Sequence, residues 1–471
     1  MTVGDQPLAL AVVFSSISSR LPLLRNLTLV CADSWRREGV HRVWEQLGSI
    51  TQVTSLEVLF RGADGAAGGP DNPNSCWMHQ LAPLRGLTGL QRLCMDSCTR
   101  QQQEAGQGPL GSGFQFLEAL TALTSLDIPT PSCQGLASIS SCTSLQALRL
   151  RALPGQISSS SHGARLSNTD WEVVGQLERL SELRLRRSHQ PRTLTVEGQQ
   201  PMYAALSKLT ALQSVGYVVW TTGALPALAA LPELRSVQGL WVPMGDADGA
   251  RCEKVTRLEH NTHRRSMVEF SAFPKLEVYY PTACSVDAQF WESMAAFCPN
   301  LREVCGPVEP TTGLLDFRKD SWDLRMTSTF DSTSAERLSA IRSLSQLTAL
   351  TRLSFRSSHH LEVATLAEAV PSVRELHLVA LQPVSCMSLA PLAKLCALTS
   401  LCLYLQDCSA LQHQHDLPVL LSALSRVPKV VVAGLGESSA LERVVQGAWN
   451  VGLLLPADLS VVCFATRSVG F

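Results

Sequence analysis

The feature that most constrains this sequence is a short leucine-bearing phrase that recurs along the chain. Four clear copies are "LTALTSLDI" (Leu120–Ile128), "LERLSELRL" (Leu177–Leu185), "LTALTRLSF" (Leu347–Phe355) and "LCALTSLCL" (Leu395–Leu403). Each copy places apolar residues at its positions 1, 4, 7 and 9. A spacing of three is typical of a helix or tight coil, and a spacing of two is typical of a strand. Each phrase therefore predicts a coil that leads into a short strand.

The copies follow one another at a regular interval. Their last apolar residues are Leu29, Val58, Met95, Ile128, Leu150, Leu185, Tyr217, Val278, Phe355, Leu378, Leu403 and Val432. Degenerate copies, "LPELRSV" and "CPNLREV", lie in the two wide gaps of this series. A period of about 20 to 40 residues predicts a solenoid, in which units stack because one unit cannot bury its leucines alone.

The Leu-x-x-Leu-x-Leu cores of these phrases resemble the leucine-rich repeat family over nearly the whole chain. The resemblance implies an α/β solenoid that is curved, with parallel strands on its concave face and helices on its convex face. That family usually places Asn or Cys three residues past the last apolar position. Here Ala32, Pro131, Leu153 and Leu381 occupy those places. We therefore expect irregular repeats in which this polar ladder is mostly missing.

The spacing of the copies suggests a domain organisation. We predict an N-terminal cap over 1–20 and a first sub-solenoid over 21–240. Degenerate repeats with irregular insertions follow over 241–337, and the charged stretches 251–265 and 311–334 are expected there as insertions or hinges. A second sub-solenoid over 338–435 and a C-terminal cap over 436–471 complete the chain.

Composition narrows the classes of partner. Of 471 residues, 45 % are hydrophobic, 17 % charged and 6 % aromatic, so we expect a folded chain with an aliphatic core. A net charge of −1 provides no general field for nucleic acid or an anionic membrane, so neither is expected as a partner. No apolar run approaches the ~18 residues of a membrane span. Fifteen cysteines without a Cys-x-x-Cys pair favour free thiols in a reducing compartment.

Motifs that carry chemistry are not found in the sequence. It contains no phosphate-binding loop, no nucleophile elbow and no zinc-binding helix of the His-Glu-x-x-His type. The pair His260 and His263 has no further ligands at metal-site spacing. We therefore predict no enzyme, no cofactor and no metal site.

The residue between the two leucines of each strand should point away from the core, because side chains alternate along a strand. Stacked strands would align these residues in a row. That row is Thr28, Glu57, Cys94, Asp127, Arg149, Arg184, Gly216, Glu277, Ser354, His377 and Cys402.

Two neighbouring copies make this row basic. "LRLR" gives Arg149 and Arg151, and "LRLRR" gives Arg184 and Arg186. Arginines this close repel one another, so an acidic or phosphorylated protein partner is expected to bind them on the concave face. The alternative is a solvated face that Glu178, Glu182 and Asp170 partly neutralise.

Two functions fit these observations. The first is a non-enzymatic protein-binding scaffold of the leucine-rich repeat type; members without a signal sequence are typically cytoplasmic, and some belong to cytoskeletal or ciliary axoneme assemblies. The second is a substrate receptor of a cullin-type ubiquitin ligase, because the N-terminus resembles an F-box. The residues that carry this second resemblance are Pro7, Leu10, Phe14, Ile17, Val30, Cys31 and Trp35, with Trp44 after them. A helix across Leu24–Leu29 would favour the F-box, and a strand there would favour the first repeat.

Overall fold

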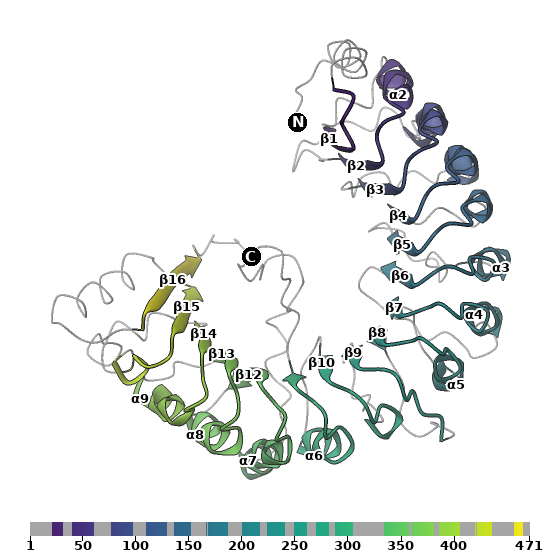
Figure 1. Cartoon of the computed structure of the whole chain (residues 1–471). Coiled ribbons are helices and arrows are strands. Elements are labelled where there is room, and N and C mark those ends of the chain that lie inside the picture. The colour runs from purple at the N-terminus through teal and green to yellow at the C-terminus, as the bar shows by residue number, and fades with distance from the viewer. Residues whose placement is uncertain are drawn as a thin grey trace, which may run out of the picture. The chain divides into compact units, whose positions relative to one another are not determined.

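The chain forms two compact units, residues 1–240 and 241–471. The computed structural model describes residues 21–31, 40–60, 77–97, 110–129, 136–151, 166, 168–186, 200–216, 224–240, 249–260, 270–281, 288–304, 334–357, 360–380, 386–405, 420, 422–435 and 456–464. Within each unit the strands are parallel and lie in the order of the sequence, as in the predicted α/β solenoid. Figure 1 shows that, in each unit, the helices lie on one side of the sheet. The other side of the sheet is the face opposite the helices.

In the first unit, strands alternate with short α-helices or 3-10 helices (η). The elements are β1 (Asn26–Cys31), α2 (Val40–Gly48), β2 (Ser55–Phe60), η2 (Trp77–Gly86), β3 (Arg92–Ser97), η4 (Leu110–Ala119), β4 (Ser125–Pro129), η5 (Ala137–Ser141), β5 (Ala147–Arg151), α3 (Asn168–Val174), β6 (Glu182–Arg186), α4 (Gln200–Leu206), β7 (Ser214–Gly216), α5 (Ala224–Ala229) and β8 (Ser236–Leu240).

The second unit continues the same alternation. Its elements are β9 (Arg257–His260), η7 (Phe270–Ala272), β10 (Val278–Pro281), α6 (Ala288–Phe297), β11 (Glu303–Val304), α7 (Ser334–Ser343), η8 (Leu344–Gln346), β12 (Arg352–Ser357), α8 (His360–Ala369), β13 (Glu375–Ala380), α9 (Cys386–Leu389), η9 (Ala390–Lys394), β14 (Ser400–Leu405), β15 (Lys429–Leu435) and β16 (Asp458–Phe464).

The recurring phrase builds the core of each repeat. Around β4, the residues Leu117, Leu120, Leu123, Leu126 and Ile128 are all 0 % exposed. Burying one leucine side chain stabilises the fold by about 1.5–3 kcal/mol, and each repeat contributes several such residues. Stability thus accumulates from one repeat interface to the next. The prediction that the apolar positions of the phrase form the buried face of each repeat is confirmed.

Aromatic residues replace leucine in one repeat of the second unit. Phe270, Phe273 and Tyr279 are almost fully buried, and Tyr279 lies in β10. The rings of Phe270 and Tyr279 meet edge to face, with centroids 5.4 Å apart. The expectation of an aliphatic core therefore holds for most repeats and is wrong for this one.

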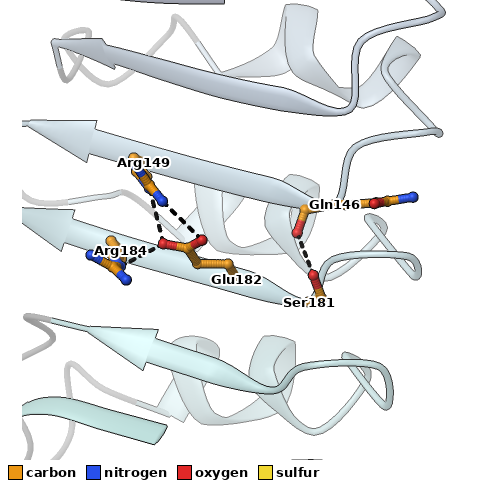
Figure 2. Close-up of polar contacts among 5 residues, drawn as sticks. All are labelled: Gln146, Arg149, Ser181, Glu182 and Arg184. Carbon is orange, nitrogen blue, oxygen red and sulfur yellow. Dashed lines mark hydrogen bonds and ion pairs between the residues drawn. The ribbon is translucent and has the colours of Figure 1, made fainter. Parts of the chain in front are cut away.

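A row of hydroxyl groups ties successive repeats together just before their strands. The hydroxyl of Thr124 donates a hydrogen bond to the carbonyl oxygen of Gln91, one repeat earlier, at 3.0 Å. Equivalent bonds join Ser181 to Gln146 at 3.1 Å (Figure 2) and Thr399 to Arg374 at 3.1 Å. The repeats thus share a polar row just before the strand. The positions three residues past the last apolar residue, where the polar ladder was expected to be mostly missing, lie outside the described residues wherever they were named above.

The first copy of the phrase is a strand. Asn26–Cys31 forms β1 and pairs in parallel with β2, and Leu27 and Leu29 are buried. Val30 and Cys31 therefore do not belong to the last helix of an F-box, and that alignment is wrong. Trp44 is buried in α2, and the remaining residues of the F-box resemblance lie outside the described residues.

Part of the predicted insertion over 251–265 is a regular repeat. Cys252, Val255 and Leu258 are buried at the 3-3 spacing of the phrase, and Leu258 lies in β9. The many charged residues that surround these three apolar positions hid the repeat from the sequence prediction. The predicted insertion 311–334 lies almost wholly outside the described residues.

A paired-arginine surface on the first unit

The register of the parallel strands aligns the outward residues of the first unit. From β1 to β7 the directly paired residues are Thr28, Glu57, Cys94, Asp127, Arg149, Arg184 and Gly216. The predicted row is thus confirmed for this unit. It brings Arg149 and Arg184 side by side on neighbouring strands, which lie ~4.8 Å apart.

In the second unit the predicted row is partly wrong. Ser354, His377 and Cys402 are paired as predicted on β12, β13 and β14. Glu277, however, precedes β10 and occupies the position of the hydroxyl row, where its backbone N–H donates a hydrogen bond to the carbonyl oxygen of Thr256. The prediction took Val278 as the last apolar core residue, whereas the buried strand residue is Tyr279.

Glu182 lies between the two arginines of the first unit (Figure 2). Nε and one terminal nitrogen of Arg149 donate hydrogen bonds to the two carboxylate oxygens of Glu182, at 2.9 and 3.1 Å. Nε of Arg184 lies 2.5 Å from Oε1 of the same carboxylate. Glu182 and Arg184 are two residues apart on β6, so strand alternation places both on the face opposite the helices.

The electrostatic environment differs between the two arginines. Hydrogen bonding from Arg149 to Glu182 is the main cause that raises the pKa of Arg149, and partial burial opposes it. The charges of Glu182 and Asp127 raise it further. The Nε of Arg184 is shielded from solvent and, despite its short distance to Glu182, makes no hydrogen bond. Arg149 is therefore the better satisfied of the two guanidinium groups.

Beyond Arg184 the row becomes uncharged. Its neighbour on β7 is Gly216, which pairs in turn with Gln238 on β8. A Cβ added at Gly216 would lie 3.0 Å from the side-chain oxygen of Gln238 and 3.3 Å from Cγ of Arg184. The glycine thus lets both side chains lean over β7.

The other predicted site residues are described only in their backbone. Arg151 and Arg186 are paired with each other on β5 and β6, two residues beyond Arg149 and Arg184. The structure does not describe their side chains. Of the three acidic residues predicted to neutralise the surface, Glu182 contacts both arginines, whereas Asp170 is buried in α3 with 4 % exposure.

Among the residues that the structure describes, no group of three or more His, Cys, Asp or Glu side chains could hold a metal ion. Among the helices described, none has the length and apolar character needed to cross a membrane.

Comparison with known proteins leaves the family open. No protein-family model matches the chain, and no curated protein matches it. A matching solved structure is the crystal structure of the Rad7 and Elc1 complex in yeast. The match covers 84 % of this chain and 88 % of that chain, at 12 % identity and a TM-score of 0.39. A likeness at this level assigns neither a family nor a function. The chain is an α/β repeat solenoid built on a leucine-bearing phrase, and its first unit carries a paired-arginine surface.

Proposed function

We propose that this chain is a non-enzymatic scaffold that binds a protein partner on the sheet of its first unit, on the face opposite the helices. The partner presents an acidic or phosphorylated segment to a surface formed by Arg149 and Arg184, with Arg151 and Arg186 at the next outward positions. The resemblance to cytoplasmic leucine-rich repeat proteins leads us to place this scaffold in the cytoplasm.

One observation carries the proposal. Arg149 and Arg184 are held side by side by strand register, and a single carboxylate, that of Glu182, contacts both of them. Two guanidinium groups that share one carboxylate leave positive charge on the face opposite the helices. An arginine pair fits carboxylate or phosphate groups well. Both arginine side chains are about a third exposed, so a partner can reach them.

Capture from cell lysate tests the proposal. The full chain with Arg149→Glu and Arg184→Glu together should lose the proteins that the unaltered chain retains, as measured by quantitative mass spectrometry. Arg235→Glu is the matched control, because Arg235 is an exposed arginine of the same unit outside the row. The control should retain the same proteins as the unaltered chain.

A second variant guards against misfolding. Charge reversal at Arg149 would place a new carboxylate beside Glu182, so Arg149→Gln with Arg184→Gln is measured in parallel, with the melting temperature of each protein. If both folded double variants capture the same proteins as the unaltered chain, the arginine surface does not bind the partner and the proposal is wrong.

A further inference from the structure

The two arginines of this surface have different structural roles, although the sequence presents them as equivalent. Arg149 uses Nε and one terminal nitrogen for two hydrogen bonds to Glu182. Its other neighbour in the row is Asp127, an acidic residue on β4. Negative charge thus flanks Arg149 on both sides, and its guanidinium plane is fixed by a bidentate contact.

Arg184 has the complementary properties. Its contact with Glu182 is an ion pair in which Nε–H makes no hydrogen bond, and this nitrogen is shielded from water. A buried donor without an acceptor is costly, so Glu182 holds Arg184 less firmly than it holds Arg149. On its far side lie Gly216 and Gln238, which bring no charge. The positive charge that Glu182 leaves over is therefore greatest at Arg184.

We propose that Arg184 is the residue that pairs with the partner, that Glu182 and Arg149 form a fixed support beside it, and that the group bound is a carboxylate of an acidic protein segment. This inference rests on the proposed function and narrows it. Glu182 becomes a specificity-determining residue, because it competes with the partner carboxylate for Arg184 while it holds Arg149 in place.

Charge favours a carboxylate over a phosphate as the bound group. Among the three side chains joined through Glu182, which are Arg149, Arg184 and Glu182 itself, two positive charges and one negative charge leave one excess positive charge, and a carboxylate carries one negative charge. A phosphate group carries a charge of about −1.5 to −2. The negative charge that remained after pairing would be repelled by Glu182 at close range and by Asp127 beyond Arg149. Arg184 can offer a carboxylate the planar fork that suits bidentate pairing.

Fluorescence anisotropy with defined peptides tests this assignment. The probes are a labelled peptide of alternating Glu and Gly, its Gln-for-Glu counterpart, and its phosphoserine-for-Glu counterpart. The full chain should bind the Glu peptide more tightly than either counterpart. Arg184→Lys keeps the charge but loses the fork, and should weaken binding of the Glu peptide about tenfold.

The remaining variants distinguish the residue that contacts the partner, Arg184, from the residues that support it, Glu182 and Arg149. Arg149→Lys should weaken binding much less than Arg184→Lys. Glu182→Gln keeps an acceptor for Arg149 and removes the competing charge, so it should tighten binding about threefold, with a steeper dependence on salt. Arg235→Lys, outside the row, should change nothing. Melting temperatures are measured for each variant, so that a loss of fold is not taken for a loss of contact.

Several outcomes would overturn the inference. It is wrong if Arg149→Lys weakens binding as much as Arg184→Lys, if Glu182→Gln does not tighten binding, if the phosphoserine peptide binds best, or if the unaltered chain binds none of the three peptides. The broader proposal is judged separately. If Arg149→Glu with Arg184→Glu still abolishes capture from lysate, the surface binds a partner whose chemistry differs from the one inferred here.

Discussion

The hydroxyl of Thr124 and the carbonyl oxygen of Gln91, one repeat apart, are joined by a hydrogen bond of 3.0 Å. The same carbonyl also accepts the backbone N–H groups of Thr124 and Ser125, at 2.8 and 3.0 Å. A single oxygen thus anchors the start of the next strand through three donors. The arrangement recurs at Thr54, Ser181, Thr351 and Thr399.

Removing these hydroxyls should loosen the first unit. Thr54→Val, Thr124→Val and Ser181→Ala combined should lower the free energy of unfolding by about 1.5 kcal/mol, roughly 0.5 kcal/mol for each bond, because each carbonyl keeps its backbone donors. Urea unfolding measures the change. Thr88→Val, at an exposed turn position, is the control and should have little effect. Equal losses in the triple variant and the control would contradict the prediction.

The sequence predicted the repeats well because burial enforces a strict spacing. In "LTALTSLDI" the apolar positions could be assigned at once, whereas the function of Thr124 within the same phrase was missed. The signal was present, since the corresponding residues in the other quoted copies are Ser181, Thr351 and Thr399. A hydroxyl that bonds to a neighbouring repeat leaves no trace in hydrophobic periodicity.

Three cysteines should resist thiol reagents in the folded protein. Cys142, Cys252 and Cys298 are buried at equivalent core positions, and burial raises their thiol pKa to about 11, 12 and 12. Alkylation at pH 8, followed by site-resolved mass spectrometry, should modify the exposed Cys396 long before these three. Comparable rates at all four sites would contradict their burial.

The same pKa shifts predict that alkaline pH destabilises the fold. In the unfolded chain a thiol ionises near pH 9, whereas Cys142 keeps its proton up to about pH 11. The unfolded state therefore binds fewer protons in this window, and the free energy of unfolding falls as the pH rises from 9 toward 11. Urea unfolding across this range should give a shallower fall for Cys142→Ala than for the unaltered chain.

Two glycines allow neighbouring repeats to approach closely on the helix side of the first unit. A Cβ at Gly48 would overlap the carbonyl oxygen of Pro83, and a Cβ at Gly86 would overlap that of Gly48. Gly48→Ala or Gly86→Ala should each cost about 1–3 kcal/mol of stability, since backbone must shift. Gly89→Ala is the control, because its nearest atom would be 3.5 Å away, and it should be tolerated. Thermal unfolding compares them; a Gly89→Ala loss as large as the others would count against this account.

The candidate surface was predictable in position and unpredictable in detail. Period-two alternation within "ELRLR" places Glu182, Arg184 and Arg186 on one face, and strand stacking then brings Arg149 beside Arg184. Which arginine Glu182 satisfies depends on side-chain rotamers, which periodicity does not encode. The error at Glu277 has a similar origin, because Val278 and Tyr279 are both apolar and only stacking decides which one is buried.

His377 should make the stability of the second unit depend on pH near neutrality. Burial lowers its pKa from the usual 6.5, the charges of Arg352 and Lys429 lower it further, and Glu375 partly opposes them. Its neighbours in the row, Ser354 and Cys402, are uncharged at neutral pH. Below pH 6.5 the unfolded chain therefore binds more protons than the folded chain. The contribution of His377 to the free energy of unfolding should be constant above this pH and should be lost as the pH drops below 6.5. His377→Gln should remove much of this slope in urea unfolding curves, and an unchanged slope would show that other groups cause it.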